Sequence, residues 1–307
     1  MEKALEFRFF ARLYFPMLKV TAYAKFDLAI HINPKKFKDG YFSVHYIDCQ
    51  INIFDKISFK KQQSKIEIIC DSLKLKKGSD NFVYKAAMLL KEIAGNEELG
   101  AKITLAKNIP IKAGFGGGSS DAAATVLGLS RLWKIKLDEN QIKELANELG
   151  KDFYYSLYGK LSEVVGKGKN YKVNTLSSHL PKFWLLVVVP KDEKPSTGWV
   201  YEHLRVKNIG RNFDKIEKLK AAILKGDKIR VLKNLSNDFE ESVSSYYPVV
   251  FKIKDSLAKL GAQASIMAGS GLSVVGFFDS RIKAEKAKSV LKDMSGLKQV
   301  LVARPIN

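Results

Sequence analysis

The chain is 307 residues long and 46% hydrophobic, which suffices for two domains of ordinary size with well-filled cores. Lys and Arg outnumber Asp and Glu by 52 to 32, and the net charge of +20 raises the question of a nucleic-acid partner. The lysines are spread along the chain without a zinc-finger, RNA-recognition or helix-turn-helix signature, so we expect a small polyanionic substrate and no nucleic acid; a nucleic-acid-binding module is the less favoured alternative.

The sequence also disfavours membrane and secreted proteins. No apolar run reaches the roughly 18 residues of a membrane span, so we expect no membrane partner. Residues 1–16 are interrupted by Arg8 and Arg12 and lack a signal-peptide core, and we treat this segment as a possible extension. The only cysteines, Cys49 and Cys70, are typical of a cytoplasmic protein with reduced thiols. The four histidines do not cluster, so they predict no metal site.

The first clear element is the alternating segment Val20–Ile32, which predicts a strand with Lys25 and Asp27 on its polar face. The sequence DGY at Asp39–Tyr41 predicts a turn. Asp80–Gly95 predicts a helix with an acidic start and a glycine stop. The other elements expected in this half are strands near 43–54, 57–60, 65–70 and 101–107, two helices that end by Gly150, and shorter strands filling 153–175.

Four glycines fall within 114–118, directly before a predicted helix over 121–133. One of the three residues at 119–121 (Ser, Ser, Asp) is expected to cap that helix. Free backbone N–H groups and the positive end of the helix dipole would then face the same point, which predicts a phosphate site. The loop is not a Walker A motif, because no Gly-Lys-Ser/Thr follows, and it lacks the third glycine of a Rossmann fingerprint.

The pattern changes near 176–180, and we predict domains over 1–178 and 179–307. The apolar run Phe183–Pro190 predicts a buried strand. Helices are expected near 213–225, 227–236, 248–260 and 280–293, and strands at 262–267, 272–278 and the last segment, LKQVLVARP. This order of elements indicates a split βαβ arrangement.

Three separated segments resemble the motifs of the GHMP kinases. YAKFDL at Tyr23–Leu28 is similar to the first motif of that family, Pro110–Ala123 to its glycine-rich second motif, and Gly269–Gly271 to its third. Within the family, the chain resembles the 4-diphosphocytidyl-2-C-methyl-D-erythritol kinases. The segments that carry this closer resemblance are DGY at 39–41, DN at 80–81, STGWVY at 196–201 and NDFE at 237–240.

The resemblance implies an α+β, two-domain fold: an N-terminal mixed sheet with a left-handed βαβ phosphate-loop unit, and a C-terminal ferredoxin-like split βαβ domain. It implies transfer of the γ-phosphoryl group of ATP, with Mg²⁺, to the 2-hydroxyl of 4-diphosphocytidyl-2-C-methyl-D-erythritol, a step of non-mevalonate isoprenoid biosynthesis. The enzyme would be a cytoplasmic monomer or weak homodimer with a small-molecule cytidyl diphosphate substrate. The alternative is another GHMP kinase, for homoserine or a mevalonate-type alcohol.

The resemblance places the catalytic lysine at Lys25 and the catalytic aspartate, acting as base, at Asp152. From the residues alone, a lysine on the solvated face of an edge strand and a turn aspartate are the simpler interpretations. The residues implied to bind ATP are Pro110, Lys112, Gly114, Gly116, Gly117, Gly118, Ser119, Ser120 and Asn81. Those implied to bind the substrate are Asp27, Tyr41, Phe42, Tyr201, Gly269 and Ser270, with Tyr41 and Tyr201 on either side of the cytosine. No metal ligand is assigned, although 119–121 lie where an ion could be held.

This sequence departs from the family pattern at three places. Phe42 stands where a histidine usually contacts the cytosine, Asp27 replaces an asparagine near the phosphates, and Phe153-Tyr154 replaces Val-Pro after the catalytic aspartate. The first departure weakens the assignment of a cytidyl substrate. None of the three weakens the assignment as a kinase.

Overall fold

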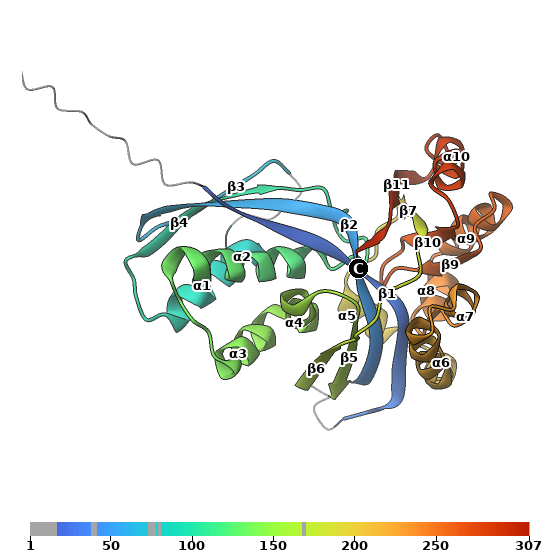
Figure 1. The fold of residues 1–307 in the computed structure, drawn as a ribbon, viewed down its shortest axis with the longest axis horizontal. Coiled ribbons are helices and arrows are strands. Elements are labelled where there is room, and N and C mark those ends of the chain that lie inside the picture. Colours follow the sequence, from blue (N-terminus) through green and yellow to red (C-terminus); the bar gives the residue numbers. More distant parts are fainter. Residues whose placement is uncertain (1–16, 38–41, 73–77, 79–80, 168–169, 307) are drawn as a thin grey trace, which may run out of the picture.

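The computed structural model describes residues 17–37, 42–72, 78, 81–167 and 170–306. The predicted turn at Asp39–Tyr41 and the segment 1–16 lie outside the described residues. The chain forms two sheets, each with its own helices (Figure 1). None of the helices in the described ranges combines the length and apolar character of a membrane span.

The first sheet is mixed and is organised around two long antiparallel strands, β1 and β2. β3 and β4 are parallel to each other and are joined through α1, whereas β4 and β5 pair antiparallel with β2. The strand order is β3-β4-β2-β1-β8. Outside this order, β5 and β12 also pair with β2, and β6 pairs with β5. The strands are β1 (Leu18–Lys36), β2 (Phe42–Gln63), β3 (Ile66–Cys70), β4 (Leu99–Ala106), β5 (Ser162–Lys167), β6 (Asn170–Thr175), β8 (Ser236–Asn237) and β12 (Pro305–Ile306).

The alternation in Val20–Ile32 correctly predicted β1, and β2 is one continuous strand where two were expected. Both faces of β1 are covered, so its polar-face residues Lys25 and Asp27 are buried as well as its apolar ones. The helices α1 (Phe82–Ile93), α2 (Gly117–Trp133), α3 (Glu139–Leu149) and α4 (Lys151–Tyr158) lie on one side of the sheet (Figure 1).

Two predictions about these helices are wrong. α2 begins at Gly117, and its N-cap is Gly116 in the left-handed conformation, so no side chain at 119–121 caps it. Strands were expected to fill 153–175, but α4 occupies 151–158, and the strands β5 and β6 form only after it. The aromatic run that starts at Phe153 favours strand locally, but Phe153 is fully buried in the core cluster that α2 and α3 also build, and this packing overrides the local preference.

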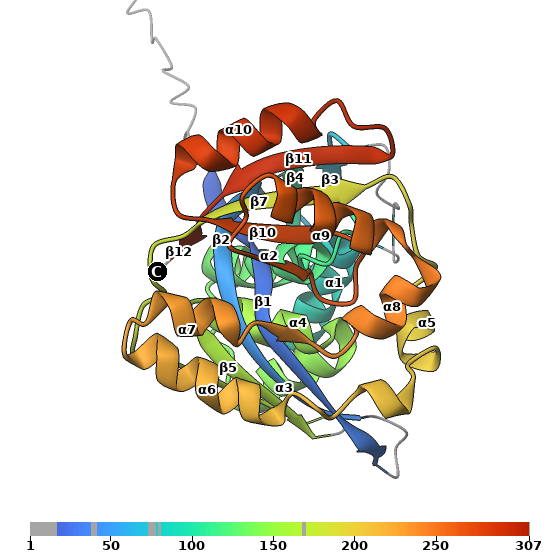
Figure 2. The same ribbon diagram turned by 90° about the vertical axis from the view of Figure 1, so that its right-hand side faces the viewer.

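The second sheet contains β7 (Trp184–Pro190), β9 (Ala264–Met267), β10 (Val274–Phe278) and β11 (Leu297–Ala303). Its order is β11-β7-β10-β9 with antiparallel neighbours, which is the predicted ferredoxin-like arrangement. α9 (Val249–Lys259) and α10 (Arg281–Leu291) cover its outer face (Figure 2). The remaining helices are α5 (Thr197–Glu202), η2 (Val206–Asn208), α6 (Phe213–Leu224), α7 (Lys228–Lys233) and α8 (Glu240–Tyr246).

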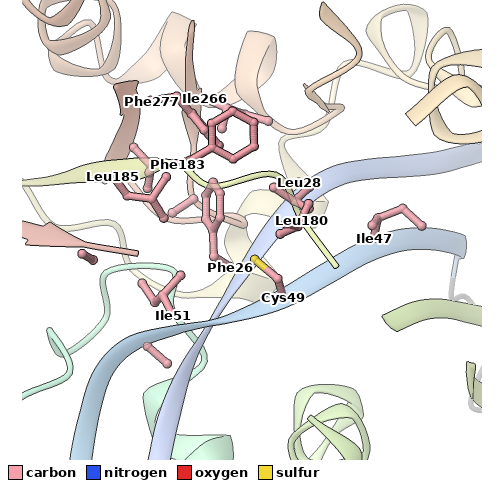
Figure 3. Close-up of a cluster of buried hydrophobic side chains, with 14 of the residues drawn as sticks. Phe26, Leu28, Ile47, Cys49, Ile51, Leu180, Phe183, Leu185, Ile266 and Phe277 are labelled. Atoms are coloured by element: carbon pink, nitrogen blue, oxygen red, sulfur yellow. The ribbon is translucent and has the colours of Figure 1, made fainter. Parts of the chain in front are cut away.

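A shared apolar core joins the two sheets. Phe26, Leu28 and Ile51 from the first sheet belong to the same buried cluster as Leu185 and Phe277 from the second (Figure 3). The predicted boundary near 178 stays a prediction, because most later elements build the second sheet whereas β8 and β12 pair with the first.

Candidate functional site

A cavity of about 550 Å³ lies where the glycine loop, β1 and the loops of the second sheet meet. Most of the residues proposed from the sequence line it: Lys25, Asp27, Asn81, Pro110, Lys112, Gly114, Gly116, Gly117, Gly118, Ser119, Asp152, Gly269 and Ser270. Phe42, Ser120 and Tyr201 lie outside the lining, and Tyr41 lies outside the described residues. Thr197 and Phe239, from the segments 196–201 and 237–240, also line the cavity, and lining residues that the sequence did not single out include Tyr46, Lys107 and Lys194.

The glycine loop is held tightly between β1 and the second sheet. The backbone N–H of Lys25 donates to the carbonyl of Phe115 at 3.0 Å. At Gly116, where φ is 62°, a Cβ would lie 2.7 Å from Lys25 Cγ, and at Gly114, where φ is 93°, a Cβ would lie 2.1 Å from the carbonyl oxygen of Ala268. Both the backbone conformation and the close contacts require glycine at these two positions. The loop is therefore fixed against the lysine and the second sheet.

Ser120, which was predicted to bind ATP, uses both of its hydrogen-bond donors inside the protein. Its hydroxyl donates to the carbonyl of Tyr23 at 2.7 Å, and its N–H donates to the carbonyl of Gly116 at 2.9 Å. Ser120 thus anchors the start of α2 to β1. Ser119 and the backbone of Gly116–Gly118 remain on the cavity side.

Lys25 is buried and paired, so its interpretation as a surface lysine is wrong. Its Nζ lies 2.5 Å from Asp27 Oδ1, 3.4 Å from Asp152 Oδ1 and 3.9 Å from Asp48 Oδ2. The side chains of Lys25, Asp27 and Asp48 are at most 7% exposed, whereas that of Asp152 is 30% exposed. Asp152 is therefore the most exposed carboxylate of this cluster, and it lines the cavity together with Asp27.

Asp48 is a site residue that sequence reasoning missed. It lies on β2 directly opposite Asp27 on β1, and the strand register brings it to Lys25. Its burial raises the pKa of Asp48 well above its usual range, Lys25 partly opposes this shift, and Asp27 adds to it. Three carboxylates around one buried ammonium cannot all be charged at low cost, and the raised pKa of Asp48 favours its protonated form. The available signal in the sequence was an acidic residue between the apolar residues Ile47 and Cys49.

A second buried ion cluster lies beneath the glycine loop. Lys107 Nζ contacts Asp55 Oδ2 at 2.5 Å and Asp121 Oδ2 at 2.7 Å. Asp55 also accepts from the backbone N–H groups of Asn108 and Ile109 at the start of the loop. Burial raises the pKa of Asp121 to about 8, against the opposing effect of Lys107. Asp55 accepts hydrogen bonds from Lys107 and from both of these backbone N–H groups, and the cluster fixes both the entry of the loop and the start of α2.

An aromatic group lies beside the cavity. The rings of Phe42 and Tyr201 stack at 5.9 Å with an interplanar angle of 19°, and Tyr201 meets Phe239 edge-on at 5.1 Å. The hydroxyls of Tyr201 and Tyr46 are 3.2 Å apart, and Lys25 Nζ lies 5.7 Å from the centre of the Tyr46 ring. Tyr46 therefore connects Tyr201, which is outside the lining, with the Lys25 cluster. Phe42 takes part in this packing through its stacking on Tyr201.

One further group, His45 with Glu163 and Glu217, has the spacing of metal ligands within the described ranges. The ammonium of Lys220 already contacts it, at 2.7 Å from Glu163 Oε1 and 3.4 Å from Glu217 Oε1. This group is an ion-pair network closed by a lysine.

Comparisons with known proteins agree on one family. Residues 81–160 match the family model of the GHMP kinases N terminal domain, and residues 219–295 match that of the GHMP kinases C terminal domain. The chain is 36% identical over 278 residues to the 4-diphosphocytidyl-2-C-methyl-D-erythritol kinase of Caldanaerobacter subterraneus subsp. tengcongensis, covering 90% of this chain and 93% of that one. It is 33% identical over 293 residues to the enzyme of the same name from Macrococcus caseolyticus, covering 94% and 99%.

Solved structures show the same fold. A crystal structure of 4-(cytidine 5'-diphospho)-2C-methyl-D-erythritol kinase superimposes with a TM-score of 0.78 at 26% identity, covering 94% of this chain and all of that one. The mevalonate kinase of Methanococcus jannaschii superimposes with a TM-score of 0.72 at 16% identity, covering 95% and 99%. At 16% identity, the similarity to the mevalonate kinase supports the fold alone.

Proposed function

Because the chain belongs to the GHMP kinases, and within them to the 4-diphosphocytidyl-2-C-methyl-D-erythritol kinases, we propose that it phosphorylates the 2-hydroxyl of that cytidyl diphosphate at the expense of ATP. The products are ADP and the 2-phosphate of the substrate, in the non-mevalonate route to isoprenoids. The observation that carries the proposal is the pair Lys25 and Asp152, 3.4 Å apart, at a cavity that the glycine loop also lines.

ATP binds with its phosphates on the glycine loop. The first turn of an α-helix leaves backbone N–H groups without partners, and the helix dipole adds positive potential there. Gly116–Gly118 present this end of the 17-residue helix α2 to the cavity without side chains. Pro110, Lys112, Ser119 and Asn81 line the same cavity and complete the proposed ATP site.

Asp152 acts as the base in the transfer step. Its carboxylate takes the proton of the 2-hydroxyl while the hydroxyl oxygen forms a bond to the γ-phosphorus of ATP, and the bond from that phosphorus to the ADP oxygen breaks. Lys25 attracts the Asp152 carboxylate and stabilises the negative charge of the transferring group. Asp27 holds the lysine ammonium in place at 2.5 Å.

We extend the proposal to Mg²⁺, the usual companion of ATP in phosphoryl transfer. Ser119 and Asp121 line the cavity within the first turn of α2, and Asp121 Oδ1 is a buried oxygen without a hydrogen-bond partner in the described part of the chain. Mg²⁺ takes oxygen ligands and often only one or two carboxylates, so this donor set fits the ion. When bound, the ion neutralises charge on the phosphate oxygens.

The cytosine end of the substrate binds beside Tyr201. An aromatic ring offers a base a stacking surface worth about 1–3 kcal/mol in proteins that bind single-stranded nucleic acids. Tyr201 is positioned by Phe42, Phe239 and the hydroxyl of Tyr46. Tyr41, the second proposed ring, lies outside the described residues, and Gly269 and Ser270 line the path between the base and the acceptor hydroxyl.

The reaction is assigned to the cytoplasm, where ATP is available and thiols such as Cys49 and Cys70 stay reduced; both are free in the structure. We infer a monomer or weak homodimer, which sedimentation analysis will test.

A kinase assay with three acceptors tests the proposed function. Purified protein is incubated with ATP, Mg²⁺ and either the cytidyl substrate, homoserine or mevalonate, and ADP and the phosphorylated product are quantified. We expect turnover with the cytidyl substrate and a kcat/KM at least about 100-fold lower with the two other alcohols, because neither carries a base for the aromatic platform. A preference for homoserine or mevalonate would contradict the proposal.

A further inference from the structure

Lys194 lies between β7 and α5 and lines the same cavity as Lys25 and Asp152. Its Nζ is 3.3 Å from the hydroxyl of Ser270, in the turn between β9 and β10, and 3.5 Å from the hydroxyl of Thr197, the first residue of α5. These two hydroxyls are themselves 3.4 Å apart. The three side chains therefore form one compact group of hydrogen-bond donors on the cavity wall.

The charge of Lys194 has no counter-ion in the described part of the protein. Lys25 and Lys107, which line the same cavity, contact three and two carboxylates respectively. No carboxylate of the described residues lies within 4.0 Å of Lys194 Nζ, and only hydroxyls contact it. The lysine is nevertheless half-buried, and burial lowers the pKa of Lys194 to about 8. Holding an ammonium in this state is costly unless an anion arrives to pair with it.

The position of Lys194 indicates which anion it meets. Thr197 and Tyr201 are one helical turn apart on α5, so the Lys194 group adjoins the proposed cytosine site. Tyr46, whose hydroxyl meets that of Tyr201, lies against Lys25 on the other side. The group thus lies along the path from the aromatic platform to the acceptor hydroxyl. In a cytidyl diphosphate alcohol, the part of the molecule between the base and that hydroxyl is the diphosphate.

We propose that Lys194, together with the hydroxyls of Ser270 and Thr197, binds the diphosphate of the cytidyl substrate and so sets the preference for a nucleoside diphosphate alcohol. This inference rests on the proposed function. An ammonium and two hydroxyls supply donors for several phosphate oxygens at once, and the charged donor contributes most of the binding. The phosphates of ATP, which we place on the glycine loop, are the other anionic groups that Lys194 could bind.

Steady-state kinetics of Lys194→Met, Lys194→Gln and Lys194→Arg test the inference, with the exposed Lys191→Met as the matched control on the same segment. For the Met and Gln variants we expect the KM for the cytidyl substrate to rise about tenfold to a hundredfold, the range for losing one charge-assisted hydrogen bond. The KM for ATP and kcat are expected to stay within about threefold. Lys194→Arg, which keeps the charge, and Lys191→Met are expected to behave as wild type.

Inhibition by product fragments separates the diphosphate from the base. CDP and cytidine are compared as competitors of the cytidyl substrate: the Lys194→Met change is expected to weaken CDP about tenfold and leave cytidine unchanged. A higher KM for ATP with an unchanged KM for the cytidyl substrate would overturn the inference in favour of the ATP phosphates, and equal weakening of CDP and cytidine would reduce Lys194 to a structural role. CDP binding to the wild type and the Lys194→Met variant is also measured by calorimetry. Tighter binding to the wild type without turnover of the cytidyl substrate would contradict the proposed function but would still support the diphosphate site.

Discussion

Asp27 and Asp48 face each other across β1 and β2, and the ammonium of Lys25 lies 2.5 Å from the first and 3.9 Å from the second. The resemblance to the family's first motif implies a neutral asparagine at the position of Asp27. Burial and, to a lesser extent, Asp27 raise the pKa of Asp48, which favours its protonated form and so offsets the negative charge of Asp27 inside the cluster. A neutral Asp48 leaves Lys25 with charge to direct at Asp152 and at an incoming phosphoryl group.

Replacing Asp48 by asparagine is therefore expected to be mild. The amide has the shape of a neutral carboxylic acid and can donate to Asp27, so kcat should stay within about threefold of wild type. Asp48→Leu removes the donor and should lower the free energy of unfolding by about 1–3 kcal/mol, because it leaves a buried polar group unpaired. Kinetics and urea denaturation of both variants measure the difference. Loss of activity in Asp48→Asn as severe as in Asp48→Leu would show that the site needs the charge of Asp48.

Asp152→Asn should remove the base while keeping the shape of the side chain. Proton transfer by a positioned group is commonly worth about 10²–10⁴-fold, so kcat should fall by that order while the substrate Kd is largely kept. Lys25→Met should also lower kcat, and the double variant should be little worse than the worse single variant if the two residues act as a unit. The comparison uses kcat from saturating kinetics and Kd from calorimetry. A folded Asp152→Asn enzyme with near wild-type kcat would exclude Asp152 as the base.

Gly117→Val tests the glycine loop as the ATP phosphate site. Gly117 is the first residue of α2 and lines the cavity, and even a Cβ there would lie 2.9 Å from Ile109 Cγ2 and 3.2 Å from Lys107 Nζ. The larger side chain should block the approach of the phosphates, so the KM for ATP should rise at least about tenfold, or activity should be lost. Substrate binding by calorimetry and circular dichroism show whether the fold is intact. Unchanged ATP affinity in a folded variant would refute this placement.

The affinity for the cytidyl substrate should depend on pH through Lys194, whose pKa burial lowers to about 8. Below that pH the ammonium is charged and pairs with the diphosphate; above it the amine is neutral and the pairing is lost. The KM for the substrate should thus rise as pH increases from about 7 to about 9, whereas the Lys194→Arg enzyme should show a flat profile because its guanidinium stays charged. Identical profiles for the two enzymes would mean that another group controls binding.

Those parts of the site that depend on local pattern could be predicted from the sequence. The alternation around Lys25 predicted β1, and the glycines of 114–118 predicted a loop directly before a helix. Contacts that depend on register could not be predicted: Asp48 meets Lys25 only because β2 pairs with β1 in one particular alignment. Lys107 and Asp55 are likewise 52 residues apart, and no spacing rule connects them.

Helix boundaries and short helices show a second limit. The aromatic residues that begin at Phe153 have a local preference for strand, and only their packing with α2 and α3 makes the segment helical. α5 has 6 residues and α8 has 7, too few for a helical period to stand out in the sequence. Lys194 lies just before α5 and lines the cavity, whereas Tyr201 lies on α5 outside the lining, and neither placement could be predicted from a helical period.

The strands β8 and β12 come from the second half of the chain but pair with β1 and β2 of the first sheet. A cut near 178 would therefore separate strands from their partners and expose the apolar surface around Phe26 and Phe277 on both pieces. We therefore expect the two sheets to unfold together as one cooperative unit. Movements that admit ATP and release ADP are then expected in the loops around the cavity rather than at a hinge between the sheets.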